Sequence, residues 1–214
     1  IVETTVNSLK ELVAEPFIVS AMGSHGGGTE EGQREVLAGY GITEERLGVP
    51  VVTTVDTVYL GNCANGRPVW FDRAAYEADL IVPINRVKLH TDFVGPIQSG
   101  LCKMLVIGLG NHKGCSAVHE EAPEVFADAI EETARLILQK APVGFGIAIL
   151  ENAYDKTYAV EAVPAEHLVE REKELVQIAK GNMPYIMLDE ADVIVCGAIG
   201  KDISGAGFDP NILG

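Results

Sequence analysis

Apolar residues recur along the chain in two patterns, one typical of amphipathic helices and one typical of buried strands. Apolar side chains at helical spacing predict helices at residues 2–13, 33–40, 72–78, 101–109, 123–140 and 164–180. Short continuous apolar runs predict buried strands at residues 17–21, 80–84 and 144–150. Because strands and helices alternate, the pattern predicts an α/β fold built on a mostly parallel, doubly wound sheet.

One stretch interrupts this alternation with strands that follow one another directly. Residues 51–55, 57–60 and 68–71 have the composition of strands, and Asn65-Gly66 is a favoured hairpin turn before the last of them. The pattern therefore predicts a small antiparallel hairpin excursion from the parallel sheet.

A change of pattern near the carboxyl end indicates a domain boundary. Gly181 and Pro184 end the predicted helix at 164–180, and the apolar run at 191–198 predicts a new strand. We expect residues 1–181 to form one domain, and residues 182–214 to be a linker and the first unit of a second α/β domain. The chain opens on Ile1 within a helical pattern, so we expect it to be an excerpt of a longer protein.

Composition narrows the classes of partner. The 214 residues are 47% apolar and 22% charged, as in ordinary globular proteins, and no apolar run is long enough to span a bilayer. The net charge of −15 repels phosphate backbones and anionic headgroups, which argues against nucleic acid and membranes as partners. The four cysteines are widely spaced and form no CxxC motif, so we expect reduced thiols and a cytoplasmic location.

The first candidate site is the glycine-rich segment Gly23-Ser-His-Gly-Gly-Gly28, between a predicted strand and a predicted helix. Gly26 and Gly27 lack side chains, so a ligand or cofactor can approach the backbone there. His25 can act as a base or a metal ligand, because the pKa of imidazole lies near neutrality. The alternative is a histidine in a turn that needs only its glycines.

The second candidate site is the polar segment from Asn85 to Lys103, which follows the strand predicted at 80–84. Its cations Arg86, Lys88 and Lys103 stand out in an acidic chain and indicate an anionic ligand, although each lysine alone could be solvated surface. Lys103 lies in an apolar stretch, where a charged side chain is costly unless it is paired or used, for example as a reactive amine.

Two histidines follow in the next predicted helical segment. His112 and His119 fit one helical face, but they form neither HExxH nor another compact zinc signature. A metal bound by one segment is therefore not supported, whereas a ligand set drawn from several segments stays open. We expect His167, on the charged helix at 164–180, to be solvated surface.

Together, His25 in its glycine loop, Lys88-Leu-His90 after a strand, Lys103 and His119 resemble the nickel-pincer-dependent lactate racemase family. The resemblance implies that Lys103 tethers a nickel-pincer nucleotide, a pyridinium thioamide/thiocarboxylate mononucleotide. It also implies that His119 is the nickel ligand, and that His25 and His90 are the acid/base pair. In the family's second domain, Lys201 is a further candidate for the cofactor site.

The resemblance implies an isomerase that racemises or epimerises a 2-hydroxy acid. One histidine would remove the hydroxyl proton while the α-hydride moves to the pincer ring, and return of the hydride to the opposite face would invert the centre. From charge alone, we add Arg86 or Lys88 as the ligand of the substrate carboxylate. The stretch between His90 and Lys103 is longer than in lactate racemases, so the substrate within this class stays open.

Two other functions fit parts of the same pattern. A phosphate- or nucleotide-handling enzyme would cradle phosphates with Gly26–Gly28 and residues 205–207, although the chain has no Walker-type glycine-lysine-serine/threonine motif. A non-catalytic binding domain would keep the fold and lack the chemistry.

Overall fold

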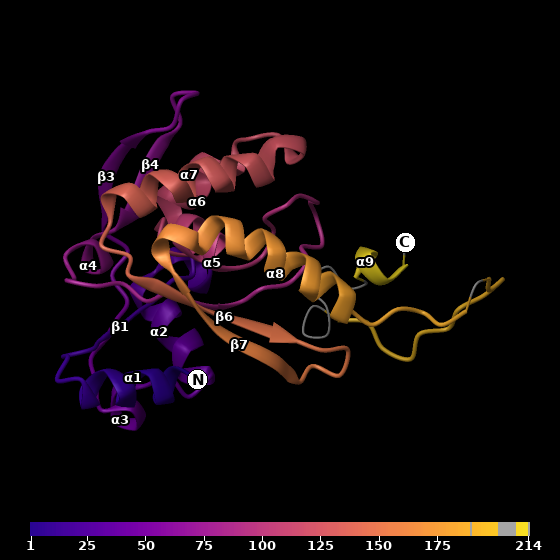
Figure 1. The fold of residues 1–214 in the computed structure, drawn as a ribbon, viewed down its shortest axis with the longest axis horizontal. Coiled ribbons are helices and arrows are strands. Elements are labelled where there is room, and N and C mark those ends of the chain that lie inside the picture. Colours follow the sequence, from indigo (N-terminus) through magenta and orange to yellow (C-terminus); the bar gives the residue numbers. More distant parts are fainter. Residues whose placement is uncertain (189, 201–208, 214) are drawn as a thin grey trace.

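The structure is a computed structural model that describes residues 1–188, 190–200 and 209–213 (Figure 1). Its strands are β1 (Ile18–Val19), β2 (Val51–Val52), β3 (Thr57–Asn62), β4 (Pro68–Asp72), β5 (Ile84–Arg86), β6 (Phe145–Glu151) and β7 (Thr157–Pro164). Its helices are α1 (Val2–Glu11), α2 (Glu30–Gly39), α3 (Glu44–Leu47), α4 (Arg73–Tyr76), α5 (Leu101–Lys103), α6 (Asn111–His119), α7 (Phe126–Lys140), α8 (Leu168–Asn182) and α9 (Pro210–Leu213).

The strands form three small sheets. β1 pairs with β2 in parallel, β3 pairs with β4 in an antiparallel hairpin, and β6 pairs in parallel with β5 and antiparallel with β7. The predicted α/β class and the antiparallel hairpin excursion are confirmed. The parallel pairings lie in separate sheets, and Pro83, which has no N–H to donate, separates the isolated bridge between Ile81 and Val143 from β5.

The main hydrophobic core is built around the short helix α5. α5 contacts β5 and β6 on one side and α7 and α8 on the other, and Figure 1 shows α8 lying over β6 and β7. Leu101 and Cys102 of α5 are fully buried, as are Ile130 of α7 and Leu175 of α8. Lys103 therefore stands on the most enclosed helix of the domain.

A π-helical turn, Met104–Gly108, continues α5 toward α6. The N–H of Leu109 donates to the carbonyl of Met104, five residues earlier. The widened turn brings Gly108 against the segment that follows β1, so that a Cβ at this position would lie 2.7 Å from the carbonyl oxygen of Ala21. The prediction of one regular helix at 101–109 therefore missed this turn, and π turns frequently accompany functional sites.

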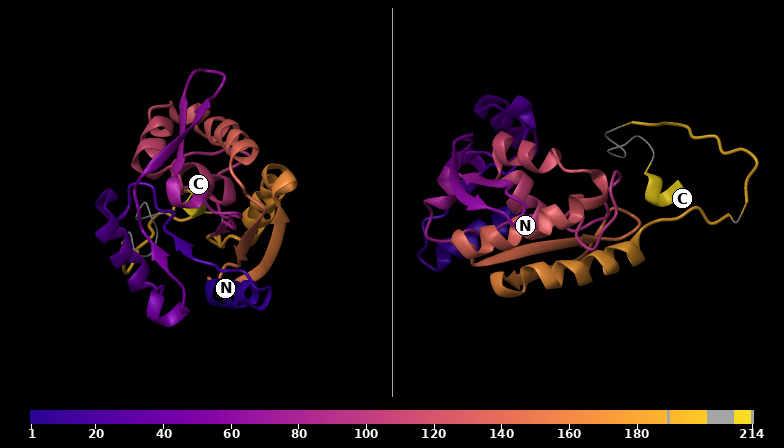
Figure 2. Two further views of the ribbon diagram at one scale, coloured as in Figure 1. Left: turned by 90° about the vertical axis from the view of Figure 1, so that its left-hand side faces the viewer. Right: turned by 90° about the horizontal axis from the view of Figure 1, so that it is seen from above.

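Two other elements differ from the sequence predictions. The strand predicted at 80–84 begins at Ile84, and β7 was not predicted although its residues alternate in burial. The predicted strand at 191–198 is not formed in this part of the chain. Residues 183–188 and 190–200 leave the body without regular structure (Figure 2), and Val193 and Val195 are exposed there because no strand among the described residues pairs with them.

Membrane-spanning helices are not found in the described ranges, because none of their helices combines sufficient length with sufficient apolarity. The two-domain division at residues 181 and 182 stays a prediction.

A buried carboxyl group anchors the start of α5. Glu172 of α8 is fully buried, and its Oε2 accepts a hydrogen bond of 2.8 Å from the backbone N–H of Cys102. Gly100 leaves the space that the carboxyl group needs, since a Cβ there would lie 2.6 Å from the Glu172 carboxyl carbon. The other oxygen, Oε1, is buried and has no hydrogen-bond partner in the described structure. Burial raises the pKa of Glu172 to about 7.

The raised pKa predicts a pH-dependent stability that Glu172→Gln should remove. Since the folded state holds the proton more tightly than the unfolded chain, ionisation destabilises the fold as the pH rises toward and through about 7. We expect Glu172→Gln to be more stable than the wild type at pH 8, by up to about 3 kcal/mol, and the difference to shrink at pH 5.5. Denaturant unfolding at both pH values measures this difference in the free energy of unfolding.

Glu170→Gln, on the same helix, is the matched control. Arg135 hydrogen-bonds Glu170 and lowers the pKa of that carboxyl, so its removal should not stabilise the protein at pH 8. An equal stability difference between wild type and Glu172→Gln at both pH values would contradict the raised pKa of Glu172.

Candidate active site

Lys103 stands at the end of α5, where the buried helix meets the π turn. Its side chain is half-buried, and its Nζ lies 6.0 Å from the centre of the Phe93 ring. Burial is the main cause that lowers the pKa of the Lys103 amine, and the positive charge of Lys88 lowers it further. A lowered pKa increases the fraction of neutral amine, which is the nucleophilic form.

Four aromatic rings form a row beside this lysine. The His90 ring lies 4.2 Å from Phe93, Phe93 lies 4.9 Å from Phe126, and Phe126 stacks 5.1 Å from His119. Both phenylalanines are buried, so the histidines at the two ends are held against a fixed apolar support. The row thus gathers His90, Lys103 and His119, three predicted site residues from three separate segments.

The loop that carries His90 is closed at its base. Lys88 and Ser99 exchange backbone hydrogen bonds of 2.8 and 3.2 Å, so the residues between them loop out and the chain returns directly to α5. The backbone N–H of His90 donates to Oε1 of the buried Gln98 at 2.7 Å, which braces the loop from inside. The long stretch between His90 and Lys103 therefore leaves the two residues close together.

His90 is held as a neutral imidazole. Its Nδ1 accepts a hydrogen bond of 3.1 Å from the backbone N–H of Asp92, so the neutral ring carries its proton on Nε2. Burial lowers the pKa of His90 to about 4, assisted by the positive charges of Lys103 and Lys88 and opposed by Asp92. At neutral pH the ring is uncharged and presents an N–H.

The neutral ring of His25 carries its proton on Nδ1, the nitrogen opposite to that in His90. It lies exposed at the start of the 3₁₀ turn Gly26–Gly28, and its Nδ1 is 2.9 Å from the carbonyl oxygen of Met22, which can only accept. The ring proton is therefore on Nδ1, and Nε2 offers a lone pair. Gly26 and Gly27 have φ of 64° and 69°, a left-handed conformation that glycine adopts without strain.

The glycine loop is tied to the elements that carry the other candidates. The N–H of Gly23 donates to the carbonyl of Gly108 in the π turn at 3.0 Å, and the Ser24 hydroxyl lies 3.1 Å from Nδ1 of His112 in α6. Buried Gln33 of α2 donates to the Gly23 carbonyl and accepts from Ser20. Within the described residues, no hydrogen bond or ring contact joins His25 itself to the aromatic row.

His119 is the last residue of α6 and is exposed. Burial of part of the ring and the charge of Lys103 lower its pKa, which favours the neutral form that metals bind. No hydrogen bond to the ring is formed in the described part of the chain. A cluster of three or more metal-binding side chains is likewise not found among the described residues, so further ligands for a metal at His119 would have to come from a bound group.

The two cations predicted to hold a substrate carboxylate lie differently. Lys88 is exposed, and its charge affects both His90 and Lys103, which places it with the row. Arg86 of β5 is engaged by Glu151 of β6, at 3.0 and 3.3 Å. His167 is exposed, as expected. Lys201 and residues 205–207 lie outside the described residues.

A pocket of about 370 Å³ opens beside His90. Its lining includes Asp92, Phe93 and Glu124, together with Asn211 from α9, whose side chain donates to the backbone carbonyl of His90 at 2.9 Å. Sequence reasoning missed Phe93, Gln98 and Phe126. An aromatic residue within the polar segment 85–100 was the available signal for Phe93, whereas Gln98 and Phe126 matter only through the folded loop.

Comparisons with known proteins bear on this geometry. Residues 1–128 match the family model of the lactate racemase N-terminal domain. Among solved structures, the chain resembles the lactate racemase apoprotein from Thermoanaerobacterium thermosaccharolyticum, with a TM-score of 0.62 and 19% sequence identity. The match covers 81% of this chain and 45% of that protein, so the chain spans less than half of the relative's length. No curated protein sequence matches the chain.

The lowered pKa of His90 can be tested by titration of the protein without ligands. We expect its imidazole resonances in NMR spectra to titrate with a midpoint near pH 4, because the ring is buried beside two cations. Lys103→Met should raise this midpoint, since it removes the largest charge effect. Arg86→Met is the control and should leave it unchanged. A midpoint above 6 in the wild type would contradict the lowered pKa of His90.

Proposed function

The chain belongs to the lactate racemase N-terminal domain family, and from that premise we propose that it is the catalytic part of a 2-hydroxy-acid racemase or epimerase. The observation that carries the proposal is the gathering of His90, Lys103 and His119 along one row of rings, beside a glycine loop that holds His25. The finer roles below are part of the proposal.

The fit of Lys103 to a covalently tethered cofactor follows from its surroundings. The amine stands on a buried helix whose start is fixed by Glu172, and its lowered pKa makes the neutral amine more available. A covalent tether needs a rigid attachment point, because every freely rotating bond between protein and cofactor makes the position of the reacting atoms less well defined. We therefore propose that Lys103 bears a nickel-pincer nucleotide.

The fit of His119 to nickel rests on its imidazole, which has no hydrogen bond to another described residue and whose pKa is lowered toward the neutral form. Imidazole is a suitable ligand for nickel, and stacking on Phe126 fixes the plane of the ring. A single histidine can hold nickel only if the bound cofactor supplies the remaining nickel ligands, as a pincer does. When bound, the nickel-pincer nucleotide would accept and return the hydride of the substrate's C2, so that the hydroxy acid passes through its keto acid without net oxidation.

The two proposed acid/base histidines differ in which ring nitrogen carries the proton. His25 offers a lone pair on Nε2, with its other nitrogen fixed by the Met22 carbonyl, and is ready to accept the hydroxyl proton. His90 presents an N–H, and it can accept a proton at Nε2 only after its ring proton moves to Nδ1 and the Asp92 hydrogen bond is released. We propose that His25 is the base in the state described here, while His90 donates a hydrogen bond to the substrate oxygen.

The charge pattern supports an anionic substrate. Lys88 and Lys103 place positive charge beside the row in a protein of net charge −15, and a carboxylate bound there would be neutralised. Of the two cations predicted for this role, Lys88 is the better placed, because Arg86 is paired with Glu151. The pocket beside His90 does not carry this argument, because its lining holds the carboxylates of Asp92 and Glu124 and includes neither lysine.

The tether is tested by mass spectrometry of the protein made together with the enzymes that synthesise the cofactor. We expect an adduct that peptide mapping places on Lys103, and nickel bound in step with it. Lys103→Ala should lose the adduct and lower racemase activity at least about 1,000-fold, because positioning of the reacting groups is lost. Lys140→Ala, at the exposed end of α7, is the control.

Full nickel-dependent activity in Lys103→Ala would refute the tether. Nucleotide binding that needs no nickel, measured by calorimetry, would favour the phosphate-handling enzyme instead. A protein made with the cofactor enzymes that carries neither nickel nor an adduct would favour a non-catalytic binding domain.

The acid/base roles are tested by His25→Gln and His90→Gln. Each variant should keep the Lys103 adduct and the nickel content but lower kcat at least about 100-fold, since a positioned proton donor or acceptor contributes about that much. His167→Gln, exposed and remote in the chain, should keep full activity. A variant of His25 or His90 that loses cofactor rather than kcat would assign that residue to binding.

A further inference from the structure

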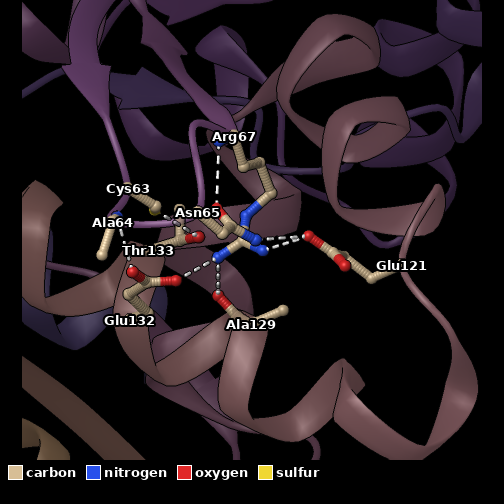
Figure 3. Close-up of polar contacts among 8 residues, drawn as sticks. All are labelled: Cys63, Ala64, Asn65, Arg67, Glu121, Ala129, Glu132 and Thr133. Atoms are coloured by element: carbon tan, nitrogen blue, oxygen red, sulfur yellow. Dashed lines mark hydrogen bonds and ion pairs between the residues drawn. The ribbon is translucent and has the colours of Figure 1, made fainter.

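A buried arginine outside the proposed machinery joins the β3–β4 hairpin to α7 and to the turn after α6 (Figure 3). Arg67 lies just before β4, and only 4% of its side chain is exposed. The part of the hairpin turn that carries it is held by a hydrogen bond from the N–H of Cys63 to the Arg67 carbonyl, and by another from the N–H of Arg67 to Asn65. The guanidinium therefore projects from a fixed turn into the protein.

The guanidinium binds two separate segments. It donates to the carboxylate of Glu121, in the turn after α6, and to Glu132 and the backbone carbonyl of Ala129, both on α7, at 2.8 and 3.3 Å. Asn65 adds a second bond to Glu121, at 2.9 Å. Arg67 thus fixes the distance between the turn and the body of α7.

These two segments carry the two rings at the end of the aromatic row. Glu121 lies two positions after His119, and its N–H donates to the carbonyl of Val118, so its position is coupled to the last turn of α6. Phe126, on which His119 stacks, begins α7, one helical turn before Ala129. A single side chain therefore holds both sides of the His119–Phe126 stack.

We infer that Arg67, acting through Glu121, is a positioning residue for the imidazole of His119. Metal-binding histidines usually have their orientation fixed by a hydrogen bond from the second ring nitrogen. Among the described residues the His119 ring has no such bond and is oriented by stacking instead, so its position depends on how firmly α6 and α7 are held together. The inference rests on the proposed function where it concerns nickel.

A role of Arg67 and Glu121 in stability alone predicts fewer effects of their loss than a role in positioning His119 does. Loss of the Glu121 contact would lower stability in either case. A positioning role alone predicts that the ring-current shift which Phe126 imposes on the His119 protons is reduced, and that nickel leaves faster while the Lys103 adduct stays. These two readouts separate positioning from stability.

Glu121→Ala is the variant of choice, because Glu121 lies in a turn and its side chain is 26% exposed, so the fold should survive. Glu161→Ala is its matched control, since Glu161 likewise binds an arginine, Arg171 on α8. Arg67→Met serves as a second variant. In the protein without ligands, NMR of the His119 ring should show the shift change for Glu121→Ala and not for Glu161→Ala.

In the protein carrying the cofactor, nickel loss to a chelator should be about 10–100-fold faster for Glu121→Ala, with an unchanged mass adduct on Lys103. Unchanged His119 resonances in Glu121→Ala would overturn the inference. A wild type without adduct or nickel would overturn the proposed function instead, and the His119 resonances would then decide the positioning role alone.

Discussion

The burial of α5 between α7, α8 and β6 is the constraint on which the rest of the site depends. A three-residue helix is not stable alone, and tertiary packing with the Glu172 hydrogen bond must supply what local propensity does not. Leu101 and Cys102 are fully buried, and Lys103, the last residue of α5, is half-buried beside them. The burial also lowers the pKa of its amine, so packing and reactivity have the same cause.

Apolar supports hold His90 and His119 near Lys103, and a backbone hydrogen bond joins the glycine loop to the turn that follows α5. Phe93 and Phe126 hold His90 and His119, while the π turn that follows α5 carries the glycine loop through Gly108. Each support is fixed by the core rather than by solvent-exposed ion pairs, which contribute little. The arrangement therefore places the polar side chains of the candidate site on segments that packing holds in place, as a catalytic site requires.

The sequence predicted those parts of the fold that local periodicity controls. The helices at α1, α2, α7 and α8 and the Asn65-Gly66 hairpin follow from apolar spacing and turn chemistry. The π turn, the closure of the loop between Lys88 and Ser99, and the clamp of Arg67 depend on contacts between distant segments, which no window along the chain contains. Among the site residues, Lys103 was marked by a charge in an apolar run, whereas Arg86 was marked only as a cation in an acidic chain and pairs with Glu151.

The electrostatics of the site couple anion binding to proton transfer. Without a ligand, the charges of Lys88 and Lys103 lower the pKa of His90, and the charge of Lys88 also lowers the pKa of Lys103. An anion bound beside them would offset this repulsion, and by reciprocity the binding would be tighter when His90 and Lys103 are protonated. On the proposed function, a substrate carboxylate bound beside the two lysines would raise the proton affinity of His90, so that the ring would be a stronger base in the complex than without the anion.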